Sequence, residues 1–221
     1  MLAELLPSAV ESVEVFGDGC DDGELLPAEK ALVAGVTEKR RREFTGARVC
    51  ARLALARAGV RPAPILPGPT GAPQWPAGVV GSLTHCDGYR AAAVARTEAF
   101  AAIGIDAEPH APLPDGVLAK VASESEQTAL GRLASRTGEL CWDRMIFSAK
   151  EAVYKAWSPA TGRWLGFADA EVEIDPDGVF TARLLVAGPL VGGRPLTTYR
   201  GSWAVGSGVV ITAVTVPVDA G

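Results

Sequence analysis

Positive charge, cysteine and long apolar runs are all scarce in this sequence of 221 residues. Its net charge is −5, so no global positive field would attract a nucleic acid or an anionic membrane surface. The four cysteines are scattered without a CxxC pair, which argues against a zinc site and against a disulfide framework. No apolar run reaches the roughly 18 residues of a transmembrane helix. The first residues, MLAELLPSAVESVE, have no basic segment before the apolar run and are atypical of a signal peptide, so we expect a cytoplasmic protein.

Lysine is rarer than arginine in this sequence: five of the 21 basic residues are lysines and the other 16 are arginines. Gly and Pro together number 41, which predicts many turns but falls short of a disordered composition. Apolar residues make up 48% of the chain, which is ordinary for a folded globular protein. A chain of this length forms one domain or two small ones.

Hydrophobic periodicity predicts a mixed α/β (α+β) protein. We expect helices over about 37–58, 123–136 and 142–157, and a Pro- and Gly-rich loop over 61–78. A hairpin is predicted from strands 79–84 and 89–95, because Asp-Gly lies between them, and a third strand covers 102–108. The first strand falls at 10–16, and after Phe167 the chain is mostly strands. A linker near 109–116 predicts two halves, 1–108 and 109–221.

Three groups of polar residues are candidates for chemistry. Asp106 and Glu108 point to the same face of a strand, which suits Mg²⁺, although two solvated acids at an exposed edge would look the same. Glu151 and Lys155 are four residues apart on a helix, where an ordinary surface pair worth about 0.2–0.5 kcal/mol is the alternative.

The third group is a strand end, Gly81-Ser82-Leu83-Thr84-His85, where His85 and two hydroxyls could bind a phosphate or could be structural. On the helix over 37–58, Arg41, Arg48 and Arg52 fall within about 40° of one another. This stripe is either a phosphate clamp or a solvated edge.

Taken in order, these segments resemble one family. GSLTHCDGYRAAAVA, IGIDAEP and FSAKEAVYKAW are similar to the three motifs of the Sfp/EntD-type 4′-phosphopantetheinyl transferases, most of all the actinobacterial enzymes of polyketide and nonribosomal peptide pathways. The separations fit as well, with about 20 residues from His85 to Asp106 and 45 from Asp106 to Glu151. The resemblance extends through EKRRREFTGARVCARLAL and nearly the whole chain.

The resemblance implies two similar α/β halves related by a pseudo-twofold axis, with coenzyme A bound in the cleft between them. It implies an enzyme that moves phosphopantetheine from coenzyme A to a serine of apo acyl or peptidyl carrier proteins and releases 3′,5′-ADP. It also implies a monomer, with no nucleic-acid or membrane partner.

The family's roles transfer to matching positions. Asp106, Glu108 and Glu151 would hold Mg²⁺, with Mn²⁺ as an alternative, and Glu151 would also serve as general base. The cations and hydrogen-bond donors around coenzyme A would be these: Arg40, Arg48, Arg52, Thr84, His85, Lys150 and Lys155. The helical wheel favours Arg41 where the family pattern favours Arg40. Pro67 and Thr70 stand where relatives often carry basic residues, so one cationic contact to the nucleotide is expected to be missing.

Two other functions remain compatible with these residues. One is an Mg²⁺-dependent phosphohydrolase, which would release phosphate from coenzyme A without a carrier protein. The other is a catalytically silent paralogue that only binds carriers, although such a protein would be expected to have lost an acid or a lysine.

Overall fold

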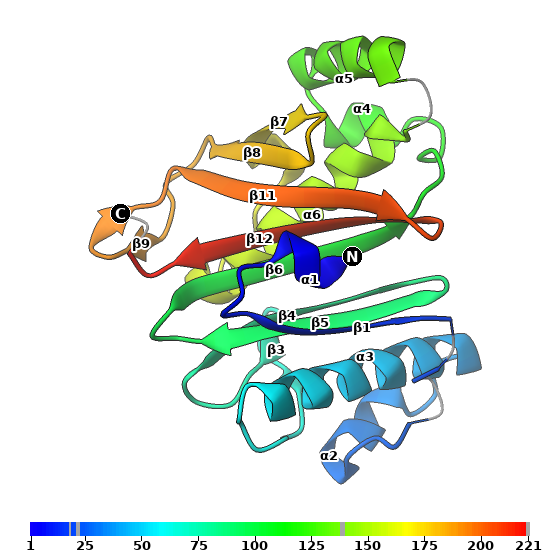
Figure 1. Cartoon of the computed structure of the whole chain (residues 1–221), viewed down its shortest axis with the longest axis vertical. Coiled ribbons are helices and arrows are strands. Elements are labelled where there is room, and N and C mark those ends of the chain that lie inside the picture. Colours follow the sequence, from blue (N-terminus) through cyan, green and yellow to red (C-terminus); the bar gives the residue numbers. More distant parts are fainter. Residues whose placement is uncertain (18, 21–22, 138–139, 220–221) are drawn as a thin grey trace.

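The computed structural model describes residues 1–17, 19–20, 23–137 and 140–219, and it is a mixed α/β protein built around two antiparallel sheets (Figure 1). The larger sheet has the strand order β6-β12-β11-β8-β7, with these bounds: Phe100–Pro109, Val209–Pro217, Thr198–Gly206, Val179–Leu184 and Ala170–Asp175. The smaller sheet has the order β1-β5-β4, with bounds Glu11–Phe16, Tyr89–Arg96 and Val79–Cys86. The mixed α/β class predicted from periodicity is therefore confirmed.

Two 20-residue helices cover the sheets. α3 (Glu38–Arg57) packs on the smaller sheet, and α6 (Trp142–Thr161) packs on the larger one (Figure 1). The remaining helices are short or peripheral: α1 (Leu2–Leu5), α2 (Pro27–Lys30), α4 (Leu118–Val121) and α5 (Glu124–Thr137). Single turns and two-residue strands complete the fold: η1 (Ala31–Val33), β2 (Leu66–Pro67), β3 (Pro73–Gln74), η2 (Phe167–Asp169), β9 (Leu190–Val191) and β10 (Arg194–Pro195).

Local chemistry explains where the long helices begin and end. The Thr37 hydroxyl accepts a hydrogen bond from the Arg40 backbone N–H at 3.3 Å, which caps the start of α3. α6 ends at Gly162, whose φ of 64° is a left-handed conformation that glycine adopts without a steric penalty. Both ends lie within a few residues of the positions predicted from the sequence.

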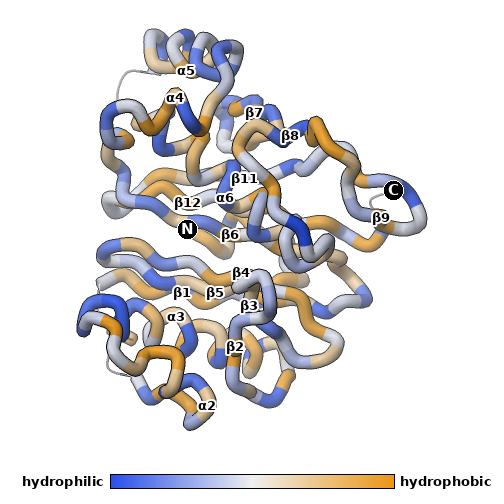
Figure 2. The backbone as a smooth tube through the Cα atoms, turned by 180° about the vertical axis from the view of Figure 1, so that it is seen from behind, coloured by the Kyte–Doolittle hydropathy of each residue, from blue (hydrophilic) through white to orange (hydrophobic). Residues whose placement is uncertain are grey.

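The two sheets meet along β4 and β6, which lie side by side but belong to different ladders (Figure 2). Side-chain hydroxyls join them: Ser82 accepts the Ile105 N–H at 3.0 Å, and Thr84 accepts the Ala107 N–H at 2.9 Å. These hydroxyls accept backbone N–H groups of β6 that point toward β4, and they therefore fix the position of one sheet against the other.

A shared core lies behind this junction. Ile103, Ile105 and Ala107 point away from the acidic face of β6 and pack with residues of β5 and β12. This is the alternation expected of a strand whose other face carries Asp106 and Glu108. The division at residue 108 would assign β6 to the first half, but its pairing with β12 places it in the sheet of the second half. The strands thus change sheets between Arg96 and Phe100, and the division into halves stays a prediction.

Candidate active site

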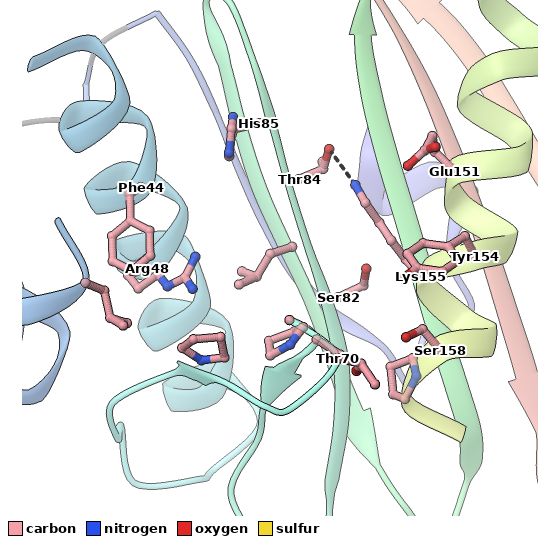
Figure 3. A pocket seen from close by; sticks show the side chains of 18 of the residues that line it. Phe44, Arg48, Thr70, Ser82, Thr84, His85, Glu151, Tyr154, Lys155 and Ser158 are labelled. Atoms are coloured by element: carbon pink, nitrogen blue, oxygen red, sulfur yellow. Dashed lines mark hydrogen bonds between the residues drawn. The ribbon is translucent and has the colours of Figure 1, made fainter. Parts of the chain in front are cut away.

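A cleft of about 640 Å³ opens between α3 and α6, with β4 along its floor (Figure 3). Its lining combines cationic, acidic and apolar side chains from both halves of the chain. The polar and charged members are Arg40, Arg48, Thr70, Ser82, Thr84, His85, Glu151, Tyr154, Lys155 and Ser158.

Asp106 is 5% exposed and does not itself line this cleft, but it contacts Lys155 and Thr84, which do. Its Oδ1 accepts a hydrogen bond from Lys155 Nζ at 2.7 Å and a longer one from the Thr84 hydroxyl at 3.4 Å. Its Oδ2 is buried and has no hydrogen-bond partner among the described residues. A buried carboxylate oxygen without a donor is costly, so this atom is available to a ligand that carries positive charge.

Gly104 explains how Asp106 comes so close to α6. A Cβ atom at Gly104 would lie 1.9 Å from the Ala152 carbonyl oxygen, so only glycine permits this approach of strand to helix. Gly104 and Asp106 are two residues apart and share a strand face. Ala152 lies between Glu151 and Lys155, less than one helical turn from either. The contact therefore brings Asp106 close to the part of α6 that carries these two residues.

Glu108 and Glu151 are the other carboxylates of the region, and both are half-buried. Burial raises the pKa of each above its ordinary value, and the negative charge of Asp106 raises both further. Positive neighbours act in the opposite direction, Arg144 on Glu108 and Lys155 on Glu151. The charge of Asp106 therefore acts on both of the other acids, which is the situation that a bound cation relieves.

Within the described part of the chain, no three His, Cys, Asp or Glu side chains are gathered tightly enough to hold a metal ion as they stand. Two of the carboxylates form ion pairs with basic side chains instead: Asp106 with Lys155, and Glu108 Oε2 with Arg144 Nη1 at 3.0 Å. The donor chemistry nevertheless fits Mg²⁺, which prefers hard oxygen ligands, and the unpartnered Oδ2 of Asp106 supplies one.

His85 faces the same cleft from the end of β4. Its Nε2 is 2.8 Å from Arg40 Nη1, and its Nδ1 is 3.7 Å from Glu43 Oε2. Burial, together with the charges of Arg40 and Lys155, lowers the pKa of His85 to about 4. The imidazole is therefore neutral at pH 7, and since Arg40 can only donate, the ring proton belongs on Nδ1 facing Glu43.

The arginine stripe of α3 is divided in the structure. Arg40 lines the cleft, whereas Arg41 is paired with Glu38 on the surface. The structure thus places Arg40, the residue of the family pattern, at the site, while the helical wheel had favoured Arg41. Arg48 lies over the Phe44 ring at 3.8 Å and also faces the cleft, where burial lowers its pKa to about 10.

Arg52 does not line the cleft. Its Nη1 is 2.9 Å from Glu29 Oε2, and Glu29 is fully buried and also accepts the Ile65 N–H at 2.9 Å. This pair joins α2 and the chain before β2 to α3. The structure therefore gives Arg52 a structural partner rather than a position for phosphate binding.

Lys150 is likewise committed to the interior. Its Nζ donates to Glu126 Oε2 at 2.9 Å and to the backbone carbonyls of Val121 and Phe167 at 2.9 and 2.8 Å. These three acceptors match the three donors of an ammonium group. Lys150 thus anchors α4 and α5 to α6 and does not reach the cleft, contrary to the role expected from the resemblance.

Comparisons with known proteins show what the whole chain is similar to. The chain matches the profile described as "4'-phosphopantetheinyl transferase N-terminal domain" over residues 28–95, and that of the "4'-phosphopantetheinyl transferase superfamily" over residues 102–211. It is 55% identical to the 4′-phosphopantetheinyl transferase Svp of Streptomyces mobaraensis, over 100% of this chain and 91% of that protein.

Two further relatives are nearly as similar. The 4′-phosphopantetheinyl transferase Npt of Nocardia iowensis is 49% identical over 97% of this chain and 99% of its own length. PptT of Mycobacterium tuberculosis is 50% identical over 86% of this chain and 85% of its own. The chain belongs to the 4′-phosphopantetheinyl transferase family.

The two profiles of the transferase family divide the chain where its sheets divide. The first ends at residue 95 in β5, and the second begins at residue 102 in β6. The described residues contain no helix long and apolar enough to cross a membrane.

Four residues in or near the cleft of this transferase are not among the site residues predicted from the sequence. Phe44 and Tyr154 line the cleft, Glu43 contacts His85, and Arg144 contacts Glu108. Helical spacing offered a signal for two of them: Tyr154 is three residues after Glu151, and Arg144 is seven residues before it. Pro67 and Thr70 also line the cleft, so the loop with the missing basic residues does face the site.

The different partners of Arg48 and Arg52 lead to a matched prediction. Arg48→Ala should weaken coenzyme A relative to its 3′-dephospho analogue by roughly 10- to 150-fold, the equivalent of a charge-assisted hydrogen bond of about 1.5–3 kcal/mol. Titration calorimetry with both ligands measures this ratio.

Arg52→Ala should change that ratio by less than about threefold, because Arg52 faces Glu29. It should instead lower stability by about 3 kcal/mol, since it leaves a buried carboxylate without its counter-ion, and lower Tm by roughly 6–12 °C. Equal discrimination between the two ligands in Arg48→Ala would remove Arg48 from the phosphate site.

Proposed function

We propose that this protein transfers the 4′-phosphopantetheine group of coenzyme A to a serine of apo acyl or peptidyl carrier proteins, and that 3′,5′-ADP leaves. The observation that carries the proposal is the ion pair between Asp106 and Lys155, because Lys155 lines the cleft together with Glu151, Arg48 and His85. These are the groups needed to bind a diphosphate, neutralise its charge and activate a hydroxyl. No nucleophile on the enzyme is required.

Three carboxylates would hold Mg²⁺, with Mn²⁺ as an alternative: Asp106, Glu108 and Glu151. Support comes from the unpartnered Oδ2 of Asp106 and from the raised pKa values of Glu108 and Glu151. When bound, the metal would neutralise the diphosphate oxygens and polarise the phosphorus that is attacked. For Glu108 and Asp106 to act together, Lys155 would have to turn from Asp106 toward the substrate phosphate.

The nucleotide end of coenzyme A would lie along α3, where Arg40, Arg48 and His85 face the cleft. A neutral His85 would contribute a hydrogen bond to phosphate rather than a charge, and for this its one ring proton would have to move from Nδ1, which faces Glu43, to Nε2 as Arg40 turns to the ligand. Thr84 would position Asp106 and Lys155, because its hydroxyl already contacts both. Lys150 and Arg52 are not assigned to ligand.

In the transfer step, Glu151 would accept the proton of the carrier serine, directly or through a water molecule. Burial raises the pKa of Glu151, which makes it a stronger base than an exposed carboxylate. The serine oxygen bonds to the β-phosphorus while the bond from that phosphorus to the bridging oxygen breaks, and the electron pair leaves with 3′,5′-ADP. Lys155 would stabilise negative charge on the transferring phosphoryl group, and the protein otherwise positions groups.

We also propose that the protein acts as a cytoplasmic monomer on carrier proteins of polyketide and nonribosomal peptide synthesis. Side chains from both α3 and α6 of the same chain line the cleft, which supports a site built within one chain. With a net charge of −5, nucleic acid is not expected among its partners.

The test is incubation of the protein with coenzyme A, Mg²⁺ and a panel of apo-carrier proteins, followed by intact mass measurement. A gain of one phosphopantetheine group that depends on Mg²⁺ and on the carrier serine is expected. A parallel sample with excess chelator tests the metal. Phosphate release from coenzyme A without any carrier, or no modification of any carrier, would contradict the proposal.

A further inference from the structure

Arg144, in the first turn of α6, uses its guanidinium to join three separate acceptors. Nη1 donates to Glu108 Oε2 at 3.0 Å, Nε to the Ala111 carbonyl at 3.0 Å, and Nη2 to the Pro112 carbonyl at 2.9 Å. Its side chain is 14% exposed. A single side chain therefore joins the end of β6 to the helix that carries Glu151. It also joins that helix to residues 110–113, the connector that follows β6.

The same connector has two attachments that do not involve Arg144. Asp143 Oδ2 accepts the Leu113 N–H at 2.7 Å, and His110 Nε2 accepts the Cys141 N–H at 3.2 Å. The backbone of the connector is thus held to the start of α6 at two other points. The contact to Glu108 is the part that Arg144 alone supplies.

The position of Arg144 on α6 matches that of Glu151. Seven residues make nearly two helical turns, so both side chains lie on the same side of the helix. The Glu108 side chain is 22% exposed, so part of it faces water and can change orientation unless a partner holds it. Arg144 holds this carboxylate through one oxygen, Oε2, and leaves Oε1 outside the ion pair.

We propose that Arg144 is a positioning residue for metal binding, which holds Glu108 in a fixed orientation beside α6 so that Glu108 can join Asp106 and Glu151 around a divalent cation. This inference rests on the metal ligands given under Proposed function. Two effects of Arg144 oppose each other: its charge repels a cation, while its hydrogen bond orients the ligand. Orientation prevails, because hydrogen-bonded partners of metal-binding carboxylates typically raise metal affinity by about 10- to 100-fold.

The experiment measures binding rather than turnover, with the full chain, coenzyme A and no carrier protein. Titration calorimetry gives the affinity for coenzyme A in excess chelator and at increasing Mg²⁺, and hence the apparent Kd for Mg²⁺. Arg144→Gln should raise the apparent Mg²⁺ Kd by about 10-fold or more. Affinity for coenzyme A without metal should change by less than about threefold, since Arg144 does not line the cleft.

Asp143→Ala is the matched control, because it removes a connector bond and leaves the Arg144–Glu108 pair in place. Its Mg²⁺ Kd should stay within about threefold of the wild-type value. Arg144→Lys keeps the charge and one donor, so it should recover part of the lost Mg²⁺ affinity. If the Gln variant does not fold, the Lys variant carries the test, with an expected rise of about threefold or more.

An unchanged or lower Mg²⁺ Kd in Arg144→Gln would overturn the proposal, and so would an equal rise in Asp143→Ala, which would make Arg144 a connector clasp only. A wild-type protein whose coenzyme A affinity does not respond to Mg²⁺ would contradict the metal ligands themselves, and this inference with them. The wild-type titration therefore separates the two failures.

Discussion

Asp106→Ala should abolish detectable transfer, with a loss of about 10³-fold or more in kcat/KM for the carrier protein at saturating Mg²⁺. Stabilising the charge of a transferring phosphoryl group through a metal is worth several kcal/mol, and each 1.36 kcal/mol is a tenfold change in rate. Asp106 would contribute to this as a metal ligand through its unpartnered Oδ2, while its 2.7 Å contact to Lys155 belongs to the state before substrate binds. Intact mass measurement of a carrier protein over time gives the rate.

The fold should survive this change. Asp106 points away from the apolar cluster of Ile103, Ile105 and Ala107, and Lys155 is 27% exposed and can turn toward water. Coenzyme A binding in excess chelator is the control, and it should change by less than about threefold or improve slightly, because a negative charge beside the diphosphate is removed. Near-normal turnover of Asp106→Ala with saturating Mg²⁺ would remove Asp106 from the metal site.

Lys155→Ala should lower kcat by about 10²- to 10³-fold while affinity for coenzyme A falls far less. Removing one preorganised donor to a developing negative charge typically has an effect of this size on turnover. In the structure the Lys155 ammonium is satisfied by Asp106 and Thr84, so binding of substrate must exchange these contacts, and the ground state gains little from the lysine. The full value of its charge is then realised in the transition state.

Separate measurement of kcat and KM for coenzyme A tests this prediction. Lys155→Arg is the matched variant, since it keeps the charge but changes its shape, and it should restore part of kcat. A raised KM with kcat unchanged in Lys155→Ala would instead make Lys155 a simple anchor for the diphosphate.

The sequence alone predicted the long elements and the faces on which the acids lie, because both depend on local periodicity. Alternation along β6 separated Asp106 and Glu108 from Ile103, Ile105 and Ala107, and the structure has this division. Helical spacing placed Glu151 and Lys155 on one side of α6, from which both reach the cleft. The order and spacing of three motifs were enough to indicate the family that the comparisons then showed.

The tertiary structure alone decided which cations face the cleft. Helical periodicity groups Arg41, Arg48 and Arg52 together, but their guanidinium groups meet different partners, and the partner of Arg52 belongs to another segment. Glu29 of α2 takes Arg52, whereas Arg41 finds Glu38 one turn away on its own helix. Burial of a carboxylate as complete as that of Glu29 demands a cation, and nothing in the local sequence around Arg52 reveals this demand.

Lys150 and Arg144 show in two ways that local sequence does not reveal which partner a cation meets. Lys150 has the sequence context of a phosphate ligand, yet Glu126 and two backbone carbonyls of distant segments hold it inside the protein. Arg144 is not predicted as a site residue from the sequence, yet the fold places it in contact with Glu108, which is 36 residues away along the chain. Local pattern fixes the direction of a side chain relative to its own element, and only the packing of elements determines the charge that it meets.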